Sequence, residues 1–430
     1  MTAGGVVAAA VALFTVGGLT GAPDPVAGPE PMSAAQPVDP ADSVKARLQG
    51  LQDAADRSPR NAARWSELGL GYVDAARQSA DPSFYGQAEG AFARSLQLRP
   101  RDNADALTGQ ATLAAARHDF AEALRLADAS LALNDFSPTT YGVKTDALVE
   151  LGRYDQGRVA VKRMLDLSPD LSSYSRASYS LELRGDVMGA RRALEAAADA
   201  ATTPADKAFA QFYLGELAFN SGDLDAATTA YGAALAEAPD SVPALAGRAK
   251  VLAAKGDRPG ALTDYRDAVE RLPQPSYAVE LGELLEAGGE TRAAQEQYDV
   301  VRASQRLFAA AGADVDQELA LFEADHGTPA AAVASASAAY RTRPQAIFVQ
   351  DAYAWALHSA GRDAEALPIA RQAVRLGTRI PSFYYHLGAI EAAAGNKAAA
   401  RTALTTALRL NPAFSPLHAP RARRLLATLG

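Results

Sequence analysis

The residues that could carry out chemistry are few and widely separated. Five histidines stand in separate parts of the chain, and no two have the spacing of metal ligands on one helix: His118, His326, His358, His386 and His418. Carboxylate pairs such as Glu283 and Glu286 are typical of a solvated helix face. No phosphate-binding loop, H-E-x-x-H metal helix or G-x-S-x-G nucleophile elbow occurs in the sequence. The chain is therefore predicted not to be an enzyme and to have no catalytic residue, no cofactor and no metal.

Composition excludes two further classes of function. The 430 residues contain no cysteine, so neither disulfides nor thiolate zinc sites can form. There are 42 Lys+Arg against 50 Asp+Glu, a formal net charge of −8, with no basic block, so nucleic acid is not expected as a partner. Only 7% of residues are aromatic, and the abundant alanine favours short helices over sheets.

The N-terminal 44 residues differ from the rest. Residues 1–22 carry no charged side chain and are about long enough to cross ~30 Å of hydrocarbon, which suggests a signal-like or membrane-anchor segment. The first basic residue is Lys45, whereas export signals normally begin with one, so a disordered or misassigned N-terminus is the alternative. Residues 23–44 form a Pro-rich acidic linker. We expect a secreted or membrane-anchored, extracytoplasmic protein, with a cytoplasmic one as the alternative.

One pattern then repeats with a period close to 34 residues. It starts at Trp65, in the form W-x₂-L-G-x₂-Y, and the intervals between most equivalent anchors are 33 or 34 residues. These anchors are Leu107, Tyr141, Tyr174, Gln211, Leu245, Ala278, Asp316, Gln350 and Tyr384. Such a period predicts a chain of similar helical hairpins.

Small residues recur at two positions of the repeat, where two antiparallel helices would cross closely. The first column is Gly69, Ala111, Thr145, Ser178, Gly215, Ala249, Gly282, Ala320, Ala354 and Gly388, and the second is Ala88, Ala123, Gly157, Ala190, Ala227, Ala261, Ala294, Ala332, Ala366 and Ala400. Glycine occupies the position eleven residues after the anchor in eight consecutive units, which predicts a left-handed turn between the helices. These glycines are Gly152, Gly185, Gly222, Gly256, Gly289, Gly327, Gly361 and Gly395. Proline often ends the second helix, as at Pro169, Pro239 and Pro412.

Together these features resemble the tetratricopeptide repeat (TPR) family over more than four-fifths of the chain. The resemblance implies an all-α solenoid, a right-handed superhelix of about ten helix-turn-helix units over residues 62–414. Capping helices are expected at 45–61 and 415–430. Because the repeats occupy the chain, no stretch of about 100 residues is left for a catalytic domain.

The resemblance also implies that the first helix of each unit lines a concave groove, with side chains one, five and eight residues after the anchor pointing inward. The resulting candidate partner-binding residues are Tyr179, Glu182, Phe209, Phe212, Glu216, Phe219, Trp355, His358 and Tyr385. Their aromatic side chains are expected to form two exposed pockets, one around Phe212 and one around Trp355, that bury side chains of a partner. The alternative is that these rings pack within the array.

The charges at these inward positions indicate the kind of partner. They include several acidic side chains but only one lysine, Lys250, so an acidic peptide would be repelled and an apolar or basic segment of a protein or peptide is favoured. We therefore predict a non-catalytic protein-interaction scaffold. A cytosolic regulator that senses a peptide or effector is the alternative.

Overall fold

The computed structural model describes residues 40–430, which form twenty-two helices and no strand within that range. The expected signal-like segment 1–22 lies outside these residues. None of the described helices has the length and apolar character of a membrane span. Helix α2 (Pro40–Arg57) begins within the segment 23–44 that was expected to be a linker. It packs on the first hairpin through Leu51, which contacts the cluster around Leu68.

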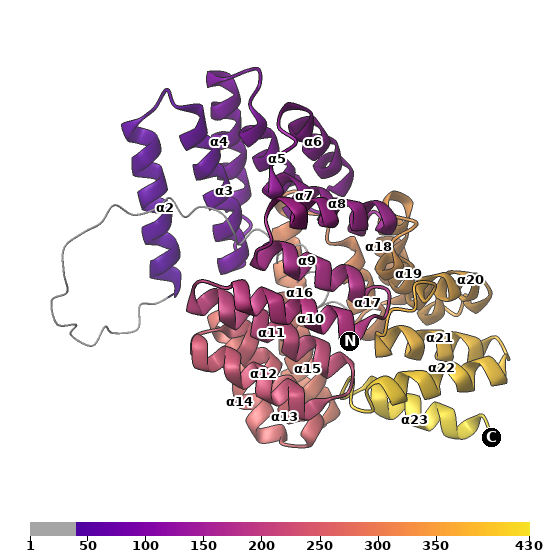
Figure 1. The fold of residues 1–430 in the computed structure, drawn as a ribbon. Helices are drawn as coiled ribbons and strands as arrows, with labels where there is room; N and C mark the ends of the chain where they lie inside the picture. The colour runs from indigo at the N-terminus through magenta and orange to yellow at the C-terminus, as the bar shows by residue number, and fades with distance from the viewer. Residues whose placement is uncertain (1–39) are drawn as a thin grey trace.

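Helices α3 to α22 form ten consecutive antiparallel pairs (Figure 1). The all-α repeat solenoid predicted from the sequence is therefore confirmed. The pairs are α3 (Ala62–Ser79) with α4 (Phe84–Leu98), α5 (Ala104–Ala116) with α6 (Phe120–Leu133), α7 (Pro138–Glu150) with α8 (Tyr154–Leu167), α9 (Leu171–Glu182) with α10 (Val187–Ala200), α11 (Pro204–Asn220) with α12 (Leu224–Glu237), α13 (Val242–Lys255) with α14 (Arg258–Arg271), α15 (Pro275–Ala287) with α16 (Thr291–Ala310), α17 (Asp316–His326) with α18 (Pro329–Thr342), α19 (Ile347–Ser359) with α20 (Asp363–Ala373) and α21 (Pro381–Ala393) with α22 (Lys397–Leu410). A final helix, α23 (His418–Thr428), follows the tenth pair.

The two columns of small residues lie where the helices of each pair cross, and every member is buried. A glycine in the first column leaves room for a ring from the second helix. A Cβ atom added to Gly215 would lie 2.4 Å from the ring of Tyr231, and one added to Gly282 would lie 2.4 Å from the ring of Tyr298. The absence of a side chain is therefore required by close packing.

Seven of the eight predicted turn glycines have positive φ angles between 71° and 89°. Gly327 is the exception, with φ −127°. Helix α18 starts at Pro329, and Thr328 before it has the extended backbone that a following proline favours. The expected caps also form, since Asp223 accepts a hydrogen bond from the backbone N–H of Ala226 at 3.0 Å.

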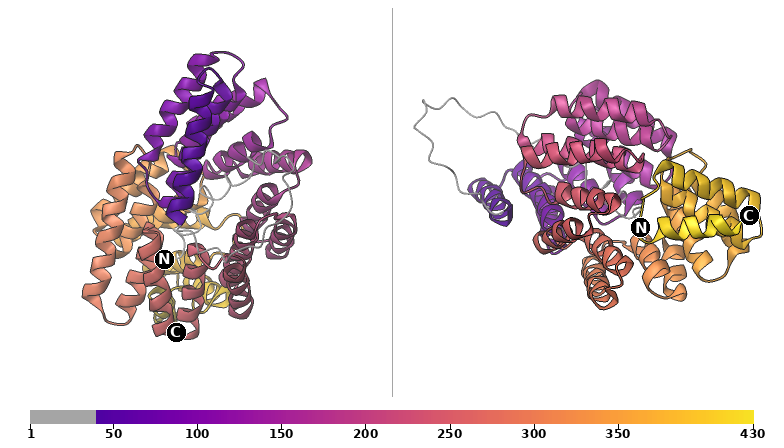
Figure 2. Two further views of the ribbon diagram at one scale, coloured as in Figure 1. Left: turned by 90° about the vertical axis from the view of Figure 1, so that its left-hand side faces the viewer. Right: turned by 90° about the horizontal axis from the view of Figure 1, so that it is seen from below.

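The superhelix closes on itself along a line of contacts that we call the seam (Figures 1 and 2). Hairpin turns of units 2 to 5 meet the loops that follow units 7 to 10. Four hydrogen bonds that involve a side chain mark the seam: His118 Nδ1 with Asp314 O (2.7 Å), Ile347 N to Tyr154 OH (2.8 Å), Thr378 Oγ1 to Leu183 O, and Asn411 Nδ2 to Phe219 O (2.7 Å). Their partners are 192 to 196 residues apart, which is between five and six repeats.

One apolar cluster continues across the seam. It joins Tyr154 and Leu183 of the first half of the chain to Ile347, Phe383 and Phe414 of the second half. The concave face is therefore covered along this side, whereas the sequence predicted an open groove. Burial of apolar surface on both sides stabilises the closed arrangement.

Replacing Ala227 with Leu is expected to overpack the crossing of α11 and α12, because Ala227 is fully buried. The free energy of unfolding should fall by about 1–3 kcal/mol, measured by chemical denaturation. Ala236→Leu places the same side chain at an exposed position of α12 and is the matched control. Equal stability of the two variants would show that the crossing is not tightly packed.

Candidate functional site

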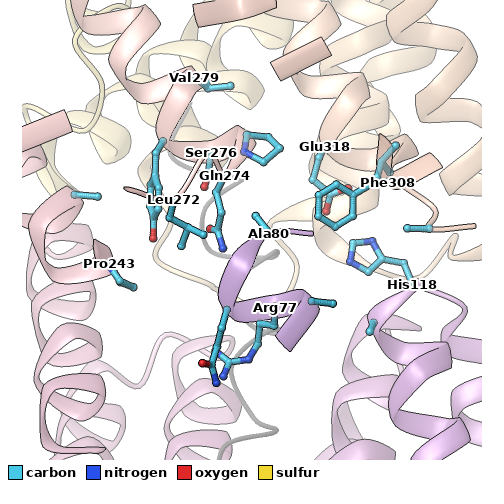
Figure 3. A pocket seen from close by; sticks show the side chains of 18 of the residues that line it. Arg77, Ala80, His118, Pro243, Leu272, Gln274, Ser276, Val279, Phe308 and Glu318 are labelled. Atoms are coloured by element: carbon cyan, nitrogen blue, oxygen red, sulfur yellow. The ribbon is translucent and has the colours of Figure 1, made fainter. Parts of the chain in front are cut away.

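The candidate site is a cavity of about 410 Å³ enclosed by the curved array, which we call the lumen (Figure 3). Its wall comes from the first helices of units 1 to 3 and 5 to 8, from Tyr85 of α4 and from the long helix α16. Representative lining residues are Arg77, Phe212, Lys250, Phe308 and Glu318. The cavity therefore brings together segments that lie far apart in the sequence.

Aromatic side chains make much of the wall apolar. Phe209 and Phe212 both contact the ring of Tyr213, with centroids 5.0 and 4.8 Å apart. Phe308 and Phe322 contribute further rings from α16 and α17. A lining of this kind can bury apolar groups of a ligand.

Lys250, the one lysine among the residues that line the lumen, forms ion pairs with glutamates of the same wall. Lys250 Nζ donates to both carboxylate oxygens of Glu216 at 2.9 Å and lies 3.8 Å from Glu280 Oε1. Burial tends to lower the pKa of Lys250, but the charges of Glu216 and Glu280 outweigh burial and raise that pKa. The pKa of Glu280 is raised, chiefly by burial, with Lys250 acting in the opposite direction. Lys250 is thus already paired and is poorly placed to receive an acidic partner.

Two hydrogen-bond acceptors in the lumen wall have no donor. Gln305 Oε1 and Glu318 Oε2 are buried and unpaired among the described residues. Asp146, by contrast, accepts two hydrogen bonds from Arg176, at 2.9 and 2.8 Å. Arg77 Nε is an unpaired donor, although the same guanidinium binds Asp74 at 2.7 Å. Because a buried unpaired acceptor is costly, the lumen favours a ligand that supplies N–H groups.

Of the nine partner-binding residues predicted from the sequence, the structure places Phe209, Phe212 and Glu216 in the lumen wall. Glu182 does not line it; burial, together with the charge of Glu216, raises the pKa of Glu182 to about 7. Tyr179 packs against the same cluster as the C-terminal aromatic residues, and its hydroxyl is buried without a partner among the described residues.

The expectation that the remaining aromatic residues are exposed is wrong. Phe219, Trp355 and Tyr385 are only 2%, 7% and 5% exposed. Trp355 stacks on His358 and on His386, with centroids 5.0 and 4.2 Å apart. Closure at the seam covers these faces, so the second predicted pocket is part of the packed core. The alternative that the sequence left open, packing within the array, holds for these three rings.

Several lumen residues were missed by sequence reasoning, among them Gln305, Phe308 and Glu318. Helix α16 has 20 residues, whereas α12, α14, α18 and α22 have 14, and the additional turns carry Gln305 and Phe308 into the lumen. The sequence signal for Gln305 and Phe308 was the insertion after residue 302, which lengthens this repeat beyond 34 residues. Glu318 follows the anchor Asp316 by two residues, a position that the family offsets do not select.

A family model supports the repeat assignment for the tenth unit. Residues 381–414 match the family model described as tetratricopeptide repeat. No curated protein sequence matches the chain. Among solved structures, the chain is similar to TTC0263, a thermophilic TPR protein of Thermus thermophilus, with 23% identity over 40% of this chain and 92% of that one (TM-score 0.37). It is also similar to the APC/C hetero-tetramer Cut9-Hcn1 (15% identity, 91% and 83% coverage, TM-score 0.41) and to a human IFIT1 dimer (14% identity, 85% and 87% coverage, TM-score 0.44).

Proposed function

We propose that the lumen binds a short apolar segment of a protein partner that also carries a basic side chain. The tetratricopeptide-repeat fold is typical of protein-interaction scaffolds. No chemical step is involved. The scaffold acts by holding the partner.

The observation that carries the proposal is the pair of unpaired acceptors in a wall that also carries several aromatic rings. A guanidinium or ammonium group near Glu318 Oε2 and Gln305 Oε1 would supply the missing donors. Satisfying a buried acceptor recovers about 1–3 kcal/mol that is otherwise lost to desolvation. An acidic side chain would instead meet the carboxylates of Glu216, Glu280 and Glu318.

The size of the lumen limits what can enter. A volume of about 410 Å³ lies within the range of ligand pockets, roughly 300–1,000 Å³. It has room for a few side chains, so the partner inserts a short segment and not a folded domain.

The same proposal places the scaffold outside the cytoplasm, on the basis of the uncharged sequence of residues 2–22. Cell fractionation tests this part separately. Recovery of the chain only in the soluble cytosolic fraction would favour the cytosolic regulator instead.

The binding proposal is tested with fluorescent peptides that differ in one residue, Leu-Phe-Arg-Leu and Leu-Phe-Glu-Leu with blocked ends. The Arg peptide should bind at least about tenfold more tightly, measured by fluorescence anisotropy. Glu318→Gln should reduce this preference and Phe212→Ala should weaken binding of both peptides. Glu237→Gln, at an exposed position of α12, is the control. Equal binding of the two peptides to the wild-type protein would refute the proposal.

A further inference from the structure

Four of the five histidines gather at the C-terminal side of the lumen, although the sequence predicted that they are scattered. The rings of His358, His386 and His418 lie within 6.2 Å of the ring of Trp355. His326 lies 3.4 Å from Glu283, and Trp355 Nε1 donates to Asp325, the neighbour of His326, at 2.9 Å. These side chains belong to consecutive repeat units and to the helix that follows them, and the stacking of the units brings them together.

Three side chains in this region converge on one point. Glu283 of α15 and Asp325 and His326 of α17 each offer a ligand atom, and these atoms all lie within 4.8 Å of one another. Their side chains are 2%, 3% and 4% exposed. Carboxylates so deeply buried are stable only with a compensating positive charge or a full set of hydrogen bonds.

A fourth side chain points at this group and has unused nitrogen atoms. His418 of α23 is fully buried, and neither ring nitrogen makes a hydrogen bond with a described residue. Its Nε2 atom lies 3.3 Å from Asp325 Oδ1. Asp325 Oδ2 is also buried without a partner among the described residues. Leaving such atoms unpaired is costly, so the arrangement calls for a ligand.

The nitrogen–oxygen distances in this group are long for hydrogen bonds and are compatible with ligands around a metal ion. His326 Nε2 to Glu283 Oε1 is 3.4 Å, and His418 Nε2 to Asp325 Oδ1 is 3.3 Å, both longer than the preferred 2.7–3.2 Å of a hydrogen bond. Four ligands at ~2.1 Å from a tetrahedral ion are about 3.4 Å apart. Two edges of such a tetrahedron are therefore already present.

We propose that Glu283, Asp325 and His326 bind a divalent transition-metal ion of the Zn²⁺ class, and that His418, 3.3 Å from Asp325, becomes the fourth ligand by a small movement of its ring. Two imidazole nitrogens and two carboxylate oxygens suit Zn²⁺, whereas Mg²⁺ and Ca²⁺ prefer oxygen ligands alone. The surroundings support the ligands: His326 Nδ1 lies 3.5 Å from Glu286 Oε2, which orients the ring with Nε2 toward the site.

The ion can reach the site and would connect distant parts of the fold. A second cavity of about 230 Å³, lined by Glu283 and Ser415, adjoins it. The ligands come from α15, α17 and α23. One bound ion would therefore link the C-terminal helix to the seventh and eighth units. Metal binding should therefore raise thermal stability as well as occupy the site.

The test uses the full-length protein, freed of metal with a chelator and titrated with ZnCl₂ in a calorimeter. We expect one Zn²⁺ per chain, a higher melting temperature with Zn²⁺, and no comparable effect of MgCl₂. Asp325→Asn and His418→Gln should each weaken Zn²⁺ binding by ~100-fold or more. His358→Gln should bind as the wild type does, because His358 pairs with Asp363 outside the site.

A wild-type protein that binds no Zn²⁺ in this titration would overturn the proposal. So would Asp325→Asn and His418→Gln variants that keep wild-type affinity. Circular dichroism confirms that each variant is folded, and if one of the two does not fold, the other and the wild-type titration decide the result.

Discussion

Replacing Gly222 with Ala is expected to open the seam and to lower the free energy of unfolding by about 2–5 kcal/mol. Two effects add. Gly222 has φ +77°, a conformation that costs a residue with a Cβ atom about 1–2 kcal/mol. In addition, the new Cβ would lie 2.5 Å from the carbonyl oxygen of Leu410, so the loop after α22 must move away, which adds about 1–3 kcal/mol.

Gly361→Ala separates these two effects. Gly361 occupies the same place in its own unit and has φ +71°, but a Cβ atom there would meet nothing within 4 Å. This variant should lose only the backbone contribution of about 1–2 kcal/mol. Denaturant titration gives both free energies, and small-angle X-ray scattering should show a larger radius of gyration for Gly222→Ala alone. Equal losses and equal radii would mean that the seam does not hold the array closed.

The local architecture could be predicted from the sequence because each unit repeats the same short-range rules. Gly215 must be small because it faces the ring of Tyr231, and Asp223 caps the helix that follows it. Such contacts join residues within one hairpin, so their signal recurs with the 34-residue period. Gly327 departs from the pattern, with a φ angle of −127°.

The closure of the array could not be predicted in this way. Its contacts join residues nearly 200 positions apart, and several use backbone oxygens, such as the carbonyl groups of Leu183 and Phe219. Because every residue has the same backbone carbonyl group, such a contact does not require a particular residue type. The family offsets selected Phe212 and Glu216, which line the lumen, but could not tell that Phe219, Trp355 and Tyr385 are covered by other parts of the chain.

The same limit applies to the histidines and to the lumen. Glu283 and His418 lie far in sequence from Asp325 and His326, and only the folded array places these side chains together. Gln305 enters the lumen because α16 is longer than its counterparts. Both sites depend on long-range geometry, which the period alone does not specify.

Phe219→Ala is expected to lower the free energy of unfolding by about 3–5 kcal/mol, because the ring is 2% exposed and packs with Ala227, Tyr231 and Val251. Its removal leaves a cavity that the neighbouring helices can fill only in part. Had Phe219 lain in an open groove, the same change would leave stability nearly unaltered. Chemical denaturation distinguishes these two outcomes.

Phe136→Ala is the control, since Phe136 is 72% exposed and has Arg163 5.7 Å from its ring centroid, a contact that contributes about 0.5–1 kcal/mol. Measurements on Phe219→Ala also distinguish a loss of core packing from an opening of the seam. Asn411 binds the backbone carbonyl of Phe219, and alanine retains that carbonyl. A large loss of stability in Phe219→Ala with an unchanged radius of gyration would therefore report burial of the ring, whereas an enlarged radius would show that the ring itself keeps the superhelix closed.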